Sequence, residues 1–247
     1  MPTPASPWRG LILATQFLTR LPTPAVHDFQ PADLSRSAHG FPLVGLLVGG
    51  VVLGAGWAGA RLDPWLGALS GLLAWVWVTG GLHIDGLADL FDGLGAAHRD
   101  PARLLAVMRD PHVGGMGALA MILQLLAKLV LLMLAVREGL WLVLLLTPAW
   151  ARLGTLVWAS VLPPLDPGLG ERFGWSIRPA AIALWGLALM GASFLYAPAL
   201  LLAPLVIAGW AWFLKRKVGG MSGDMLGAGT EVSESVLLLA ACGVALA

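Results

Sequence analysis

Long apolar stretches alternate with short polar stretches along most of this chain. A helix that crosses a membrane needs about 20 apolar residues, with about 17 to 25 as the working range. Six stretches meet this length: Phe41–Ala60, Trp65–Gly81, Gly114–Val136, Leu140–Leu162, Pro179–Tyr196 and Pro198–Leu214. The pattern predicts an all-α fold, a polytopic membrane helix bundle.

Two apolar segments are too short to be counted with these six. Val236–Ala247 has twelve residues and is expected to be a short or re-entrant helix, or to span if its helix begins near Val232. Trp8–Leu18 is expected to lie at the membrane interface or to fold into the bundle. We therefore predict a single integral membrane domain, residues 1–247, with about six to seven transmembrane helices.

The composition excludes a soluble protein. Hydrophobic residues make up 58% of the chain and the mean hydropathy is +0.82, whereas soluble domains are about 45–50% apolar. The 15 basic and 14 acidic residues are too few to coat a soluble domain of 247 residues. Nucleic acid binding is not expected, because basic residues cluster only at Lys215–Lys217.

Three polar regions separate the predicted spans: His83–His112, Pro163–Arg178 and Lys215–Glu234. Alternate crossings from a cytoplasmic N-terminus place all three on the cytoplasmic side. Eleven Lys and Arg residues then lie on this side, and only Arg61 and Arg137 on the other, as the positive-inside rule requires. We expect the active-site regions to be residues 83–112 and 215–234.

Three aspartates follow the second predicted span. Asp85, Asp89 and Asp92 are spaced i, i+4 and i+7, so on a helix they project from one face. Clustered carboxylates repel one another unless a cation lies among them. Oxygen ligands favour Mg²⁺ or Mn²⁺ over zinc, so all three are predicted metal ligands. The alternative is a solvated, acidic helix N-terminus stabilised by the helix dipole.

The segment Met108–Gly117 is predicted to be a loop, because Pro111 and three glycines interrupt any helix. Asp110 is a candidate metal ligand, while Arg109 and His112 are candidates for substrate contact. The alternative is a turn with solvated charges.

A glycine-rich stretch follows the basic run Lys215–Lys217, and Lys215 in this run is a candidate for substrate phosphate contact. Backbone N–H groups at Gly219, Gly220 and Gly223 are candidates to hold phosphate oxygens. Asp224 and Glu231 in the same stretch are candidate metal ligands.

Several cationic or titratable residues lie at unusual places for a membrane protein. His83 is a candidate base or metal ligand, or else a satisfied polar contact. Arg152, within a predicted span, is a candidate phosphate contact, and Lys128 could equally pair with a buried acid or carbonyl. Arg20 and His39 are candidates for phosphate contact or positive-inside anchors.

Taken together, these segments resemble the cobalamin 5′-phosphate synthase family, also called adenosylcobinamide-GDP ribazoletransferases. The similar segments occur in order: Thr19–Pro22, Phe41–Gly45, Thr79–Asp89 with Asp92 and Gly93, Met108–Asp110 with Gly114, and Gly219–Ala228 with Glu231 and Glu234. Two places depart from the family pattern, Asp110–Gly114 and Met221–Ser222. Neither departure removes a carboxylate.

The resemblance implies a Mg²⁺-dependent enzyme of the bacterial inner membrane with its active site facing the cytoplasm. It would join adenosylcobinamide-GDP to α-ribazole or α-ribazole 5′-phosphate and release GMP, in the final steps of cobalamin biosynthesis. Asp85, Asp89 or His83 would accept the proton of the ribazole hydroxyl. Membrane lipid is an expected partner, and a homo-oligomer is left open.

Two other functions compete with this one. A phospholipid-type CDP-alcohol phosphotransferase also has an aspartate-rich helix, but its usual Ala-Arg pair after the first acids is missing here. A cation-coupled transporter would use the acids to bind the transported ion. Transporter sites tend to lie near the bilayer midplane, whereas these acids fall just outside a predicted span.

Overall fold

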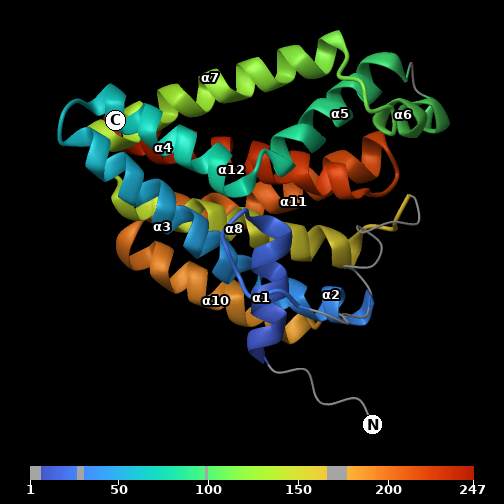
Figure 1. Cartoon of the computed structure of the whole chain (residues 1–247), viewed down its shortest axis with the longest axis horizontal. Coiled ribbons are helices and arrows are strands. Elements are labelled where there is room, and N and C mark those ends of the chain that lie inside the picture. Colours follow the sequence, from blue (N-terminus) through green and yellow to red (C-terminus); the bar gives the residue numbers. More distant parts are fainter. Residues whose placement is uncertain (1–6, 27–30, 98–99, 166–176) are drawn as a thin grey trace.

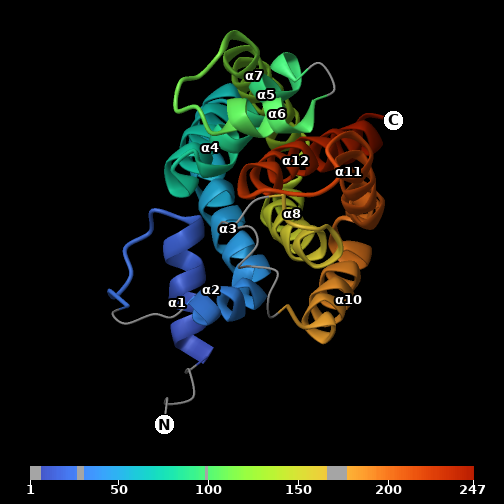
Figure 2. The same ribbon diagram turned by 90° about the vertical axis from the view of Figure 1, so that its right-hand side faces the viewer.

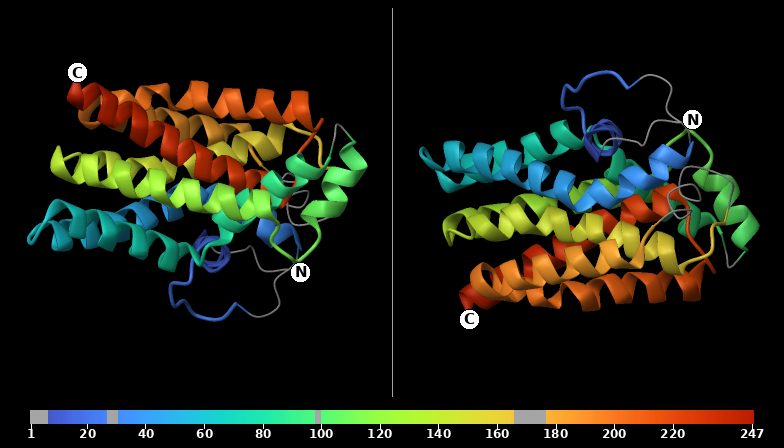
Figure 3. Two further views of the ribbon diagram at one scale, coloured as in Figure 1. Left: turned by 90° about the horizontal axis from the view of Figure 1, so that it is seen from above. Right: turned by 90° about the horizontal axis from the view of Figure 1, so that it is seen from below.

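Helices form nearly all of the regular structure, and the computed structural model describes residues 7–26, 31–97, 100–165 and 177–247. The long helices run along a common direction, with α6 beyond one end of them (Figure 1, Figure 3). We call this end the α6 end; α5 finishes there, and α3, α7, α10 and α12 begin there. The bounds are α1 (Pro7–Leu18), α2 (Pro31–Ser37), η1 (Ala38–Gly40), α3 (Phe41–Ala60), α4 (Pro64–Thr79), α5 (Leu82–Ala96), α6 (Pro101–Met108), α7 (Gly115–Arg137), α8 (Trp141–Val161), α10 (Pro179–Tyr196), η2 (Pro198–Leu202), α11 (Ala203–Lys217) and α12 (Gly223–Leu246).

The predicted polytopic membrane bundle is confirmed. Within the described ranges, six helical segments are long and apolar enough to cross a bilayer. They are Ser35–Ala60, Gly115–Arg137, Trp141–Val161, Pro179–Tyr196, Pro198–Lys217 and Gly223–Leu246. A seventh is added if α4 and α5, which meet at a bend of 84°, are counted as one broken span. Parts of two predicted polar regions, residues 98–99 and 166–176, lie outside the described residues.

The last helix is longer than the sequence predicts. α12 begins at Gly223 rather than near Val232 or Val236, and Ser222 caps it by accepting a hydrogen bond from the N–H of Met225. Most of the acidic end of the predicted polar region Lys215–Glu234 is therefore helical and packed in the bundle. Glycine disfavours a helix in isolation, but tertiary packing overrides that preference here.

The bend between α4 and α5 is made by two glycines. Gly80 and Gly81 have φ angles of 65° and 75°, a left-handed conformation that side chains other than glycine rarely adopt. The segment that follows α1 covers this turn, because Arg20 donates its backbone N–H to Val78 O at 2.8 Å. The turn therefore sets the direction of α5, the helix that carries the three aspartates.

α8 lies at the centre of the bundle (Figure 2), and 83% of its apolar 18-residue stretch is buried. α3 packs closely on α8 because Gly45 and Gly49 face its backbone, where a Cβ atom at either glycine would collide with residues 145–149. Small residues that let two backbones approach are typical of helix pairs in membranes. Gly45 and Gly49 therefore bring α3 and α8 into close contact.

α1 crosses the bundle at a steep angle to the long helices (Figure 1, Figure 2). Its buried face, with Ala14 and Leu18, packs against Phe41 and Val44 of α3. The rings of Phe17 and Phe41 stack with centroids 6.1 Å apart. The short N-terminal segment thus folds against the bundle, one of its two expected placements.

Candidate active site

The aspartates of α5 meet the beginning of α12 at a close helix crossing. Gly86 lies between Asp85 and Asp89 in space and sequence, and a Cβ atom on it would come within 2.6 Å of the carbonyl oxygen of Asp224. The lack of a side chain at Gly86 therefore lets α12 approach α5. Asp224 therefore lies on the same surface as Asp85 and Asp89.

The resulting acidic cluster consists of Asp85, Asp89, Asp92 and Asp224. Asp89 is half-buried, and it interacts electrostatically with the carboxylates of the other three. Asp85 and Asp224 are exposed, so the cluster is open to a ligand arriving from the α6 end. The structure thus brings together four of the six predicted metal ligands.

Asp92 has a structural role that the sequence did not reveal. Its two carboxylate oxygens accept hydrogen bonds from the backbone N–H groups of Gly114 and Gly117, both at 2.7 Å. They cap the N-terminus of α7, where N–H groups lack helical partners and the helix dipole favours negative charge. Any Cβ atom at Gly114 or Gly117 would collide with this carboxylate. These glycines, expected to form a loop, make room for the cap.

The donor chemistry of the acidic cluster suits Mg²⁺, because every available group is a carboxylate oxygen. Among the described residues, however, no three His, Cys, Asp or Glu side chains are close enough to hold one ion as they stand. Binding would require rotation of exposed side chains such as Asp85 and Asp224.

The other two predicted metal ligands lie elsewhere. Asp110 is exposed and accepts hydrogen bonds from the backbone N–H and the ring Nδ1 of His112, at 3.0 and 2.7 Å. These bonds hold the pKa of Asp110 below its usual value. The segment around Arg109, Asp110 and His112 is therefore an exposed turn after α6, which is the alternative that the sequence left open.

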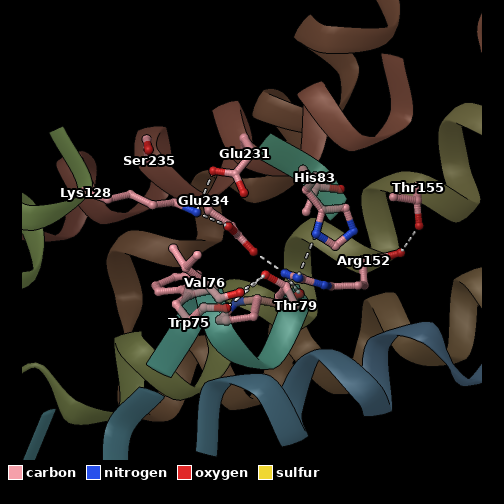
Figure 4. A network of polar contacts seen from close by, with 12 residues as sticks. Trp75, Val76, Thr79, His83, Lys128, Arg152, Thr155, Glu231, Glu234 and Ser235 are labelled. Atoms are coloured by element: carbon pink, nitrogen blue, oxygen red, sulfur yellow. Dashed lines mark hydrogen bonds and ion pairs between the residues drawn. The ribbon is translucent and has the colours of Figure 1, made fainter. Parts of the chain in front are cut away.

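Glu231 belongs to a buried network of charges in the middle of the bundle (Figure 4). The Nζ atom of Lys128 lies 2.8 Å from Glu231 and 2.5 Å from Glu234. Glu234 also pairs with Arg152, and both of these side chains are fully buried. The network has two cations and two carboxylates, so it is neutral as a whole.

The contacts in the buried network contradict the roles that the sequence predicts for Glu231 and Arg152. Glu231 accepts hydrogen bonds from Gln124 and pairs with Lys128, so it is not oriented toward the acidic cluster. Arg152 is engaged by Glu234 and His83, so it is not exposed to a substrate phosphate. Of the two readings for Lys128, the pairing with a buried acid is the one observed.

His83 connects the buried network to the acidic cluster. Its Nδ1 atom lies 3.3 Å from Nη2 of Arg152, and a guanidinium can only donate hydrogen bonds. Nδ1 is therefore the acceptor, and the proton of the neutral ring lies on Nε2. Because Arg152 engages this lone pair, the geometry favours Asp85 or Asp89 over His83 as the proton acceptor.

A pocket of about 590 Å³ adjoins Asp85 and is lined by residues of α1, the Gly80–Gly81 turn and α5. Arg20 lies on its wall, and its Nη2 atom donates to Gly80 O at 3.4 Å. Arg20, a predicted cationic contact, therefore shares this pocket with an acid of the cluster.

The glycine-rich loop between α11 and α12 is hydrogen-bonded to the segment after α8. Met221 donates its N–H to Pro163 O and accepts from the N–H of Leu165, both at 2.9 Å. Gly219 has a φ angle of 88°, and Gly220 packs directly beneath Pro163 O. The exposed Lys215 and Gly223 flank this loop. The loop therefore positions the N-terminus of α12 and its Asp224.

The fold and site define a multi-pass membrane protein with an acidic cluster at one end of its helices. A family model described as cobalamin-5-phosphate synthase matches residues 10–242. This chain belongs to that family.

Curated relatives cover nearly the whole chain. A protein named adenosylcobinamide-GDP ribazoletransferase from Thiobacillus denitrificans is 54% identical over 242 residues, 97% of this chain and 96% of the relative. Proteins of the same name from Laribacter hongkongensis and Brevibacillus brevis are 59% and 37% identical, covering 94% and 93% of this chain and 96% of each relative. No solved structure matches the chain.

Proposed function

We propose that this chain transfers the adenosylcobinamide phosphate moiety of adenosylcobinamide-GDP to α-ribazole or α-ribazole 5′-phosphate and releases GMP. The observation that carries the proposal is the acidic cluster at the α5–α12 crossing, in a chain that matches ribazoletransferases over nearly its full length. The reaction belongs to the final steps of cobalamin biosynthesis. We place the α6 end on the cytoplasmic side of a bacterial inner membrane, where nucleotide substrates are found.

Asp85, Asp89 and Asp224 are the residues that would hold Mg²⁺, because Asp89 interacts electrostatically with the other two and the backbone of Asp224 lies against Gly86 of α5. When bound, Mg²⁺ would neutralise the charge of the diphosphate and of the departing GMP. Asp92 has both oxygens engaged by α7, so its contribution would be to fix α7 beside the cluster.

The chain's own residues supply positioning and proton transfer. Arg20 stands at the pocket beside Asp85 and would hold a phosphate oxygen of the substrate by a charge-assisted hydrogen bond. Asp85 or Asp89 would accept the proton of the attacking ribazole hydroxyl. The corrinoid is large and amphipathic, so we infer that it enters from the membrane interface beside α1.

The proposal is tested with purified protein in lipid nanodiscs. GMP should be released from adenosylcobinamide-GDP only when both α-ribazole and Mg²⁺ are present, and EDTA should abolish the release. Release of CMP from a CDP-alcohol instead would favour the phospholipid-type phosphotransferase. Ion flux in liposomes without nucleotide chemistry would favour the transporter.

The close crossing of α5 and α12 gives a second test. Gly86→Ala should reduce GMP release at least tenfold and destabilise the protein by about 1–3 kcal/mol, because the new methyl group meets the backbone of Asp224. Gly54→Ala is the matched control, since a Cβ atom there meets nothing within 4 Å. Equal activity of the two variants would show that the crossing does not set the geometry of the site.

A further inference from the structure

A second cavity, of about 600 Å³, lies at the other end of α1 from the pocket beside Asp85. Its walls come from the first half of α1, from α2 and η1, from the beginning of α3, and from Arg178 just before α10. His39, one of the predicted phosphate contacts, lines it, but none of the aspartates of the acidic cluster does. The cavity is therefore distinct from the candidate active site.

The walls of this cavity are positively charged. Arg9, Arg36 and Arg178 line it together with one carboxylate, Asp33, whose Oδ1 lies 3.9 Å from Nη1 of Arg36. Among the described lining residues the cations outnumber the carboxylates, and the apolar side chain of Leu43 lies beside them. A cavity with this lining favours a ligand that combines an anionic group with an apolar part.

His39 links the backbone at two of these arginines. Its Nδ1–H donates to the carbonyl oxygen of Arg36 at 2.9 Å, and its Nε2 accepts the backbone N–H of Arg178 at 3.0 Å. Both ring nitrogens of His39 are thus engaged by backbone groups. Trp185 of α10 donates its indole N–H to His39 O at 2.9 Å, which adds a further link between η1 and α10. The backbone at Arg36 and the backbone at Arg178, far apart in sequence, are therefore joined through His39.

The cavity lies where two membrane-crossing segments begin. The candidate spans Ser35–Ala60 and Pro179–Tyr196 both start at its walls. Trp8, 72% exposed, stands at its rim, and tryptophan is enriched at the level of lipid headgroups. A ligand that has an anionic group at this level and an apolar part against the wall at Leu43 has the chemistry of a phospholipid.

We propose that this cavity binds the phosphate of an anionic phospholipid. Arg36 and Arg178 hold the phosphate oxygens, and the acyl chains descend along the wall at Leu43. The bound lipid links α2 to α10 across the N-terminal segment. Basic side chains at this depth attract anionic headgroups specifically.

The test uses native mass spectrometry of the full chain, titrated in detergent with phosphatidylglycerol or phosphatidylcholine. The wild type should retain phosphatidylglycerol preferentially. Arg36→Gln with Arg178→Gln should weaken this binding by about tenfold or more, while Arg36→Lys with Arg178→Lys should keep most of it. Arg61→Gln, whose guanidinium lies 5.1 Å from the ring of Trp57 elsewhere on the chain, should bind like the wild type.

Three results would overturn the proposal. They are equal retention of the two lipids by the wild type, equal binding by the Gln double variant when its thermal unfolding matches the wild type, and displacement of the lipid by millimolar inorganic phosphate or GDP. The last result would assign the cavity to a soluble phosphate instead. Because the Lys double variant keeps the charge, its retention of lipid separates lost binding from lost folding.

Discussion

Asp85→Asn and Asp89→Asn should each lower kcat for GMP release by about a hundredfold or more, because the neutral amide cannot hold the cation that offsets the diphosphate charge. The loss should appear mainly in kcat, since the charge to be stabilised develops during the reaction. Raising the Mg²⁺ concentration should restore part of the activity if a weakened metal site is the cause.

Asp100→Asn and Asp63→Asn are matched controls for these variants. Each of these aspartates caps a helix by accepting one backbone hydrogen bond, from Ala102 and Trp65 respectively. Asparagine caps a helix about as well as aspartate, so activity should stay near that of the wild type. If Asp85→Asn and Asp89→Asn behaved like these controls, the acidic cluster would not be the catalytic site.

The second large effect concerns stability and the buried network. Lys128→Met should destabilise the protein by about 3–5 kcal/mol, because it leaves the carboxylates of Glu231 and Glu234 with one cation between them. The measurement is the free energy of unfolding in detergent. Lys217→Met, at an exposed position on α11, should change it little.

A compensating substitution distinguishes charge balance from lost packing. Adding Glu231→Gln to Lys128→Met restores a neutral interior and leaves the pair of Arg152 and Glu234 intact. The double variant should therefore be more stable than Lys128→Met alone, with a coupling energy of about 2 kcal/mol. Additive effects of the two substitutions would mean that charge balance is not what the network provides.

Most of the membrane spans were predictable because length and apolarity alone identify them. The exception is Trp65–Gly81, because its helix α4 has 16 residues and counts as a span only together with α5. Phe41–Ala60 and Pro179–Tyr196 agree with the structure at both ends. The start of α12 was not predictable, because glycines such as Gly227 and Gly229 are typical of loops. In the structure Gly227 packs against the backbone of His83, and Gly229 against Trp210 and Trp158, and such contacts are invisible to local propensity.

Part of the candidate site was also predictable. The spacing of Asp85, Asp89 and Asp92 placed them on one helix face, and the glycines beside Asp224 drew attention to the beginning of α12. The function of Asp92 as the cap of α7 depends on a contact with residues more than 20 positions away. No local pattern indicates such a contact.

The buried charges were recognisable as unusual, but their partners were not. Lys128 and Arg152 stood out as cations within apolar spans, which usually have a partner. Both Glu231 and Glu234 lie in the predicted polar region Lys215–Glu234, and the helix is expected to begin only at Val236 or near Val232. The spacing of three between these acids is the signal that places both on one face of a helix.

The same network bears on how the protein enters its membrane. α7 and α8 precede α12 in the chain and each contributes a buried cation, whereas α12 contributes both carboxylates. If the helices passed into lipid one by one during synthesis, α7 and α8 would face hydrocarbon with unbalanced charge. The cations of α7 and α8 are therefore balanced only when α12, which follows them in the chain, packs against both helices.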